Sequence, residues 1–330
     1  MTRFDVFNGD ADGICALLQL RLANPLDTVL VTGAKRDIAL LERVDAHSGD
    51  AVTVLDIAVA ANRPALQRLL DHGVTVQYFD HHYAGQLPVH AGFDAHLDAS
   101  PSVCTGLLVD RYLGGSQRVW AVVAAYGDNL VAVAQALAAP LALHAEQRSA
   151  LHDLADCLTY NATGDSVDDA IIHPATLFGI LLRYAEPFRF MASDPAFLAI
   201  DAARRRDLDA ARRTRPAHRL PGATVYVLPD APWARRVRGI FGNEVAHAAP
   251  HLAHAVLTAN ADGGYIVSVR APRERAEGAD ALCRQFPGGG GRQAAAGIDR
   301  LSEAQLDGFV RALAAAYPGI APGPGNPPPR

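Results

Sequence analysis

Short apolar runs alternate with amphipathic stretches in the first part of the chain. Runs rich in β-branched and aromatic residues predict buried strands at Phe4–Phe7, Thr28–Val31, Ala51–Leu55 and Val74–Phe79. Apolar positions recur with helical spacing in the stretches between them, at Ile14–Leu22, Asp37–Val44 and Arg63–Asp71. This alternation predicts an α/β fold with a doubly wound, mainly parallel sheet.

Helical spacing dominates the middle of the chain, and mixed elements follow it. Predicted helices lie at Ser102–Tyr112, Gln117–Tyr126, Leu130–Ala138, Glu146–Leu158 and Asp194–Arg215. The last part predicts a smaller α/β domain, with strands at Ala223–Val227, Ala255–Thr258 and Tyr265–Arg270 and helices at Asn243–Ala249, Ala279–Gln285 and Glu303–Ala316. We therefore predict a first domain over 1–190, a linker helix and hinge over 191–221, a second domain over 222–317 and a disordered tail over 318–330.

Composition narrows the class of protein. Half of the 330 residues are hydrophobic, which excludes a disordered chain, and a net charge of −5 excludes a strongly basic protein that coats nucleic acid. The four cysteines form no CxxC pair, so a thiolate zinc site is not expected. No leader-like segment or membrane-spanning stretch is visible, and a cytoplasmic location is expected. Of 30 basic residues only Lys35 is a lysine, which we interpret as a coding bias toward arginine.

Acidic and histidine residues follow the predicted strands. The segments are Asn8-Gly-Asp10-Ala-Asp12-Gly13, Asp56, and Asp80-His81-His82, while Asp128 follows a predicted helix. The carboxyl ends of parallel strands meet at one edge of a sheet, where open α/β folds bind ligands. For one aspartate alone, a helix cap is the simpler interpretation. Four acids with tandem histidines instead favour two divalent cations, Mn²⁺ or Mg²⁺, because converging carboxylates repel one another.

These segments resemble the motifs of the DHH phosphoesterases, the superfamily of the nanoRNases and the RecJ-type enzymes. In chain order, the first motif is Asn8–Gly13, the second is Asp56, the third is Asp80-His81-His82 and the fourth is Asp128. A later pair of segments, Ser268-Val-Arg270 and Gly289–Gly297, is similar to the DHH-associated domain. The resemblance covers nearly the whole chain.

The resemblance implies a role for each matching residue. Asp56 would bridge two metal ions. Asp10 would hold the first ion with support from Asn8, and Asp12, His81 and Asp128 would hold the second. Asp80 would orient a histidine, and His82 would face the scissile phosphate. A hydroxide between the ions would attack phosphorus in line.

The glycine segment near the C-terminus suggests a phosphate grip. Gly289, Gly290 and Gly291 allow backbone N–H groups to approach a phosphate, although a flexible glycine hinge fits the same residues. Arg292 stands where the family usually has histidine, and we expect it to bind phosphate together with Arg270. Asn8 is a second departure, because the family has His or Asp at that position.

The sequence thus predicts a Mn²⁺- or Mg²⁺-dependent phosphohydrolase acting on small nucleotides. The leading substrates are short single-stranded oligonucleotides and 3′-phosphoadenosine 5′-phosphate. The alternatives are a cyclic dinucleotide phosphodiesterase, a polyphosphatase, or a non-catalytic nucleotide sensor of the same fold, which Asn8 and Arg292 would permit. We expect no membrane partner, and a homodimer is one option for the assembly.

Overall fold

The computed structural model describes residues 1–261 and 263–319, and these residues divide into two compact units after Arg204. The division falls inside helix α9 (Pro195–Arg212), which corresponds to the predicted linker helix. From residue 320 onward, the tail predicted to be disordered lies outside the described residues.

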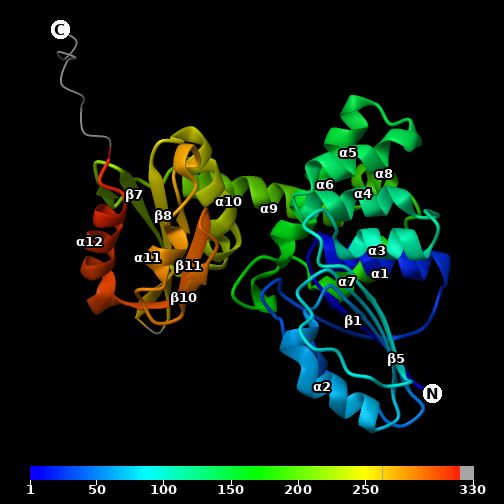
Figure 1. Ribbon diagram of the computed structural model, residues 1–330. Helices are drawn as coiled ribbons and strands as arrows, with labels where there is room; N and C mark the ends of the chain where they lie inside the picture. Colours follow the sequence, from blue (N-terminus) through cyan, green and yellow to red (C-terminus); the bar gives the residue numbers. More distant parts are fainter. Residues whose placement is uncertain (262, 320–330) are drawn as a thin grey trace. The chain divides into compact units, whose positions relative to one another are not determined.

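The first unit is built on a five-stranded parallel sheet with the strand order β2-β1-β3-β4-β5 (Figure 1). The strands are β1 (Arg3–Asn8), β2 (Val29–Gly33), β3 (Ala51–Leu55), β4 (Thr75–Asp80) and β5 (Phe93–Leu97). The four predicted strands and the parallel sheet are confirmed. Strand β5 was missed because it lies at the edge and carries mainly polar or half-exposed side chains, so it lacks a buried apolar run.

Helices cover both faces of this sheet. Helix α2 (Val59–Asp71) and a 3₁₀ turn at Leu40–Arg43 pack on one face, where their apolar side chains form a common core with β1, β3 and β4. Helix α1 (Ala11–Ala23) packs on the other face and is buried along nearly its whole length. A doubly wound sheet needs such two-sided cover, because its central strands are apolar on both faces.

The remaining helices of the first unit are α3 (Thr105–Tyr112), α4 (Arg118–Gly127), α5 (Val131–Ala138), α6 (Ala145–Ala162), α7 (Pro174–Leu181) and α8 (Pro187–Ser193). The predicted helix at Asp37–Val44 is wrong, since only the 3₁₀ turn forms there. The side chain of Asn62 explains the difference: it accepts from the backbone N–H of Leu41 and donates to the backbone oxygen of Ile38, which holds this segment outside helical geometry.

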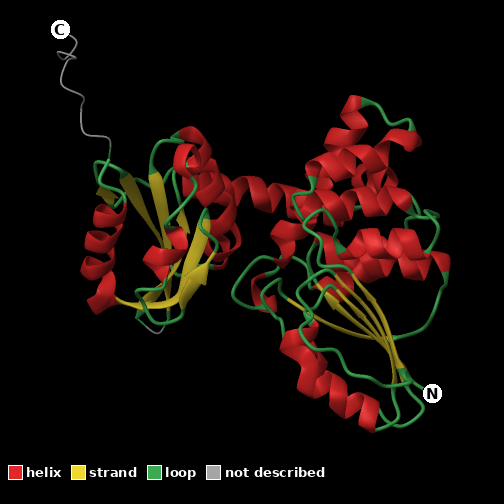
Figure 2. Ribbon diagram, viewed as in Figure 1, coloured by secondary structure: helices red, strands yellow, loops and turns green. Residues whose placement is uncertain are grey.

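The second unit contains a six-stranded mixed sheet with the order β10-β11-β9-β8-β7-β6 (Figure 2). Its strands are β6 (His218–Arg219), β7 (Ala223–Leu228), β8 (Ala253–Asn260), β9 (Gly264–Arg270), β10 (Gly289–Gly291) and β11 (Ala295–Ser302). Its helices are α10 (Pro232–Ala248), α11 (Ala279–Cys283) and α12 (Leu306–Ala316). Only β7 and β8 pair in parallel among the described strands of this sheet.

One prediction about this unit is wrong, and one segment contains an element that was not predicted. The residues expected to form a hinge include β6, which pairs with β7. The expected glycine loop forms strand β10, which pairs antiparallel with β11. Glycine has low strand propensity, so sequence pattern alone does not reveal β10.

No helix among the described residues is long and apolar enough to span a lipid bilayer.

Candidate metal centre

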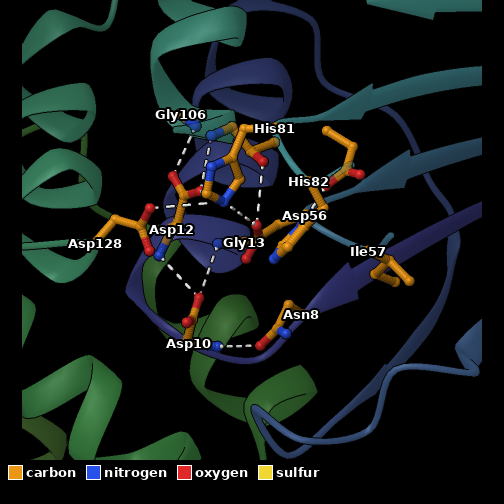
Figure 3. Close-up of polar contacts among 12 residues, drawn as sticks. Asn8, Asp10, Asp12, Gly13, Asp56, Ile57, His81, His82, Gly106 and Asp128 are labelled. Atoms are coloured by element: carbon orange, nitrogen blue, oxygen red, sulfur yellow. Dashed lines mark hydrogen bonds and ion pairs between the residues drawn. The ribbon is translucent and has the colours of Figure 1, made fainter. Parts of the chain in front are cut away.

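The predicted acidic and histidine segments meet at one edge of the first sheet. Strand β1 ends at Asn8, Asp56 directly follows β3, and Asp80 ends β4, and these three strands are adjacent and parallel. Figure 3 shows the side chains of Asp12, Asp56, His81 and Asp128 directed toward one another. The sheet therefore places residues from distant parts of the chain at one point, as expected for the carboxyl edge of a parallel sheet.

Asp10 begins helix α1 as its N-cap. Its Oδ1 atom accepts hydrogen bonds from the backbone N–H groups of Asp12 and Gly13, at 3.1 and 3.2 Å. A side chain at Gly13 would bring its Cβ within 2.2 Å of the backbone oxygen of Asn8, so the turn into the helix requires glycine. The helix-cap interpretation of Asp10 thus holds for one of its oxygens, and the other oxygen takes no part in the cap.

Asp12 is held by the N-terminus of helix α3. Its two oxygens accept from the backbone N–H groups of Thr105 and Gly106, each at 2.8 Å. The positive end of a helix dipole favours a carboxylate at this position. The sequence analysis did not predict that Thr105 and Gly106 belong to the site. The only local indication was the small residues at the start of the helix predicted at Ser102–Tyr112.

Asp56 adopts a left-handed backbone conformation, with a φ of 59°. Its backbone N–H donates to the oxygen of Phe79 on β4, and its Oδ1 accepts from the hydroxyl of Thr105 at 3.2 Å. This conformation is uncommon for a residue with a side chain and is found at functional sites.

His81 lies at the centre of the carboxylates. Its Nε2 atom is 3.4 Å from Asp56 Oδ1, 3.6 Å from Asp128 Oδ2 and 3.9 Å from Asp12 Oδ2. Asp128 reaches this point from the C-terminal end of helix α4. Two groups of residues present ligand atoms within 4.8 Å of one another, namely Asp12 with His81 and Asp128, and Asp56 with His81 and His82.

The electrostatics of these carboxylates fit a bound cation. Burial, followed by the nearby charge of Asp128, raises the pKa of Asp12 to about 6. Burial and the charges of Asp12 and Asp10 raise the pKa of Asp56 well above its ordinary range. A divalent ion would relieve this repulsion, and carboxylates with an imidazole are ligands suited to Mn²⁺ or Mg²⁺.

His82 is oriented by Asp80. Its Nδ1 atom lies 2.7 Å from Asp80 Oδ1, and 46% of the His82 side chain is exposed. The hydrogen bond to Asp80 raises the pKa of His82. Asp80 is fully buried, and its Oδ2 atom has no hydrogen-bond partner in the part of the chain that the structure describes. Because Nδ1 faces Asp80, the Nε2 atom of His82 stays available for another contact.

Lys35 was not predicted to belong to the site. Its Nζ atom lies 2.5 Å from Asp10 Oδ2, and its backbone oxygen accepts from Asn8 Nδ2 at 3.1 Å. Burial is the largest single influence on Asp10 and would raise its pKa. The charge and hydrogen bond of Lys35, together with the hydrogen bonds from Gly13 and Asp56, outweigh burial and lower that pKa below the ordinary value. The only lysine of the chain thus lies at the candidate metal centre.

A pocket of about 160 Å³ opens over these residues. Its lining includes Asp10, Lys35, Asp56, His82 and Asp128. This volume is large enough for a phosphate group.

The predicted phosphate-binding residues lie in the second unit. The Gly289, Gly290 and Gly291 backbones pair with β11. Arg270 donates to Asn243 Oδ1 at 2.6 Å and to Ser268 Oγ at 2.9 Å, so its guanidinium joins β9 to α10. Arg292 is exposed where the chain turns from β10 into β11, and its side chain has no hydrogen bond or ion pair with the described residues.

No family model matches this sequence, and no curated protein matches it. Solved structures do match. A DHH-domain protein described as belonging to a family of ribosomal proteins superimposes with a TM-score of 0.66 at 15% identity, over 95% of this chain and 86% of that one. Exonuclease RecJ bound to manganese superimposes with a TM-score of 0.63 at 18% identity, over 95% of this chain and 90% of that one. The pGpG-specific phosphodiesterase PggH from Vibrio cholerae superimposes with a TM-score of 0.58 at 13% identity, over 96% of this chain and 98% of that one.

These likenesses cover both units of the chain. This protein therefore has the fold of the DHH-domain proteins, as the sequence motifs predicted.

Proposed function

We propose that this protein is a metal-dependent phosphohydrolase of the DHH type that acts on small nucleotides. One observation carries the proposal: the Nε2 atom of His81, which lines the pocket, lies within 3.9 Å of three carboxylates. The fold shared with an exonuclease and a dinucleotide phosphodiesterase supports the same class of reaction.

Four residues would hold a divalent ion, which we take to be Mn²⁺ or Mg²⁺. They are Asp12, Asp56, His81 and Asp128. When bound, the ion supplies Lewis-acid chemistry, polarising a phosphoryl oxygen and making water a better nucleophile. The backbone N–H groups at Thr105 and Gly106 keep the carboxylate of Asp12 in place, so this side of the site is organised before any ion binds.

His82 contacts the substrate phosphate in this proposal. Its hydrogen bond to Asp80 fixes which ring nitrogen carries the bonded proton and leaves Nε2 directed away from Asp80. A positively charged imidazole stabilises the charge that develops on phosphoryl oxygens in the transition state. Arg292 of the second unit is the proposed contact for a further phosphate of the substrate.

The proposed substrates are short single-stranded oligonucleotides and 3′-phosphoadenosine 5′-phosphate. Both carry at least two phosphates, and phosphate is a group that divalent ions and arginine side chains bind. The net charge of −5 disfavours a long nucleic acid, because a chain of phosphates gains most from a basic surface.

A substrate panel with and without metal tests the proposal. We expect Mn²⁺-dependent release of phosphate or mononucleotide from a 5′-phosphorylated dinucleotide or a 3′,5′-bisphosphate, and none in the presence of chelator. Cyclic dinucleotide, polyphosphate and a chromogenic diester complete the panel. Asp56→Asn should lower kcat at least a hundredfold while the fold persists, because asparagine tolerates the left-handed conformation at this position.

The panel also separates the enzyme from a nucleotide sensor. A sensor would bind one of these compounds without cleaving it, and wild type and Asp56→Asn would be equally inactive. That result, in protein shown to bind Mn²⁺, would overturn the proposed function.

A further inference from the structure

Lys35, whose side chain is 44% exposed, places a positive charge at the candidate metal centre. Its ammonium lies 2.5 Å from Oδ2 of Asp10, whose side chain is only 4% exposed. The other oxygen of Asp10 already accepts two backbone hydrogen bonds at the start of helix α1. Both oxygens of Asp10 are therefore engaged, and the charge of this carboxylate is already balanced.

Asn8 holds this arrangement together. Its Nδ2 donates to the backbone oxygen of Lys35, and its Oδ1 accepts from the backbone N–H of Asp10 at 3.1 Å. If the Asn8 amide were flipped, its Oδ1 would face the backbone oxygen of Lys35 and its Nδ2 would face the backbone N–H of Asp10. Neither contact could be a hydrogen bond, so only one orientation of the amide fits. The backbone N–H of Lys35 donates to the oxygen of Ala162 at 2.9 Å, so the Lys35 backbone is held from two sides.

The other carboxylates of the site differ from Asp10. In the described residues, the ion pairs of Asp12, Asp56 and Asp128 are all with His81, which is charged only when protonated. These three groups retain unbalanced negative charge, whereas Asp10 does not. A divalent cation would therefore be attracted most strongly next to Asp12, Asp56 and Asp128. Next to Asp10 it would be repelled by the ammonium of Lys35.

We propose that Lys35 is a built-in cation of the site, which holds Asp10 in place of one of two metal ions. The chain accordingly binds a single divalent ion, on the side of Asp12, His81 and Asp128. Asn8 acts as a positioning residue for Lys35 and Asp10 and not as a metal ligand. This inference rests on the proposed function, because it takes metal binding by the first unit as given.

Metal stoichiometry tests the inference without an activity assay. Full-length wild type is titrated with MnCl₂ by calorimetry, and bound manganese is counted by mass spectrometry after dialysis. Lys35→Met removes the charge at nearly constant length. Arg36→Met is the matched control, because it removes one positive charge from the neighbouring residue, whose guanidinium pairs with Asp165 and does not line the pocket.

We expect one Mn²⁺ per chain for wild type and for Arg36→Met, and two for Lys35→Met. Two ions in wild type would overturn the inference and leave the proposed function intact. One ion in folded Lys35→Met would also overturn it. No bound Mn²⁺ in wild type would overturn the proposed function itself. If Lys35→Met fails to fold by circular dichroism, the wild-type count decides alone: one ion supports the inference and two overturn it.

Discussion

Asp10 and Asp12 lie two residues apart, yet their neighbours place them in opposite electrostatic surroundings. Asp10 faces the ammonium of Lys35, and its pKa lies below the ordinary value. Asp12 is buried close to Asp128, and its pKa is raised to about 6. The same residue type thus pairs with the ammonium of Lys35 at one position and is a candidate ligand for a divalent ion at the other.

The raised pKa of Asp12 predicts how stability depends on pH. A carboxyl whose folded pKa exceeds its unfolded value contributes stability below pH 3.8, and this contribution is lost as pH rises through about 6. Each unit of pKa shift corresponds to about 1.4 kcal/mol. We therefore expect Mn²⁺ to raise the Tm by roughly 5 °C more at pH 7.5 than at pH 5.

Scanning calorimetry with Mn²⁺ or chelator at the two pH values measures this difference. Asp12→Asn removes the titrating group, and its Mn²⁺-induced gain should be small at both values. An equal gain at pH 5 and pH 7.5 in wild type would contradict the assignment of Asp12 as a metal ligand.

A second prediction concerns the pair of Asp80 and His82. Asp80→Asn keeps the shape of the side chain but removes the charge that orients and protonates His82. We expect kcat to fall about 10- to 100-fold with Mn²⁺ binding unchanged, as for other residues that orient an active-site histidine. Steady-state kinetics measures kcat and a metal titration measures Mn²⁺ binding. A normal kcat for Asp80→Asn would contradict the role given to His82.

At the scale of elements, the ends of β1, β3 and β4 determine where the site forms, and the start of α3 completes it. Glycine-rich β10 is the element whose role differs most from expectation. Its residues pair with β11, so their backbone N–H and oxygen groups are partly used in a sheet. The glycines are therefore needed for packing as well as for any contact with phosphate.

Substitutions at two neighbouring glycines of β10 can distinguish a packing role from a phosphate-binding role. A Cβ at Gly289 would lie 1.8 Å from the backbone oxygen of Cys283, whereas a Cβ at Gly290 meets no atom within 4 Å. We expect Gly289→Ala to destabilise the second unit by roughly 2 kcal/mol or more, and Gly290→Ala by less than about 1 kcal/mol. Urea unfolding measures both, and equal losses would contradict the packing described for β10.

At the scale of the whole molecule, the acidic chain favours a substrate with few phosphates. The net charge of −5 includes carboxylates of the candidate metal centre, whose charge a divalent ion would offset. The proposed function therefore relies on a few specific phosphate contacts and not on a basic surface.

The salt dependence of catalysis follows from this picture. We expect Arg292→Ala to raise KM about tenfold on a short oligonucleotide with little change in kcat, and to make KM less sensitive to salt. Arg311→Ala is the control, because this exposed arginine of α12 is remote in sequence from the glycine strand. An unchanged KM for Arg292→Ala would exclude Arg292 as a substrate contact.

Much of the first unit followed from sequence pattern alone. The buried runs identified four of the five parallel strands, and the polar residues after them identified the edge where the site forms. These features are local, because burial imposes a periodicity on neighbouring residues and parallel strands end at a common edge. The edge strand β5, the glycine strand β10 and the 3₁₀ turn at Leu40–Arg43 were not recognised, because contacts from other elements and not local periodicity decide them.

The sequence by itself determined the acidic and histidine residues of the site and the kind of ion that suits them. Only the tertiary structure decided how their charges are balanced. Lys35 reaches Asp10 across 25 positions of the chain, and Gly106 reaches Asp12 across 94. Such contacts depend on how the loops pack after the sheet has formed, and no residue spacing encodes them. For this reason the only lysine of the chain carries a structural meaning that its sequence position does not reveal.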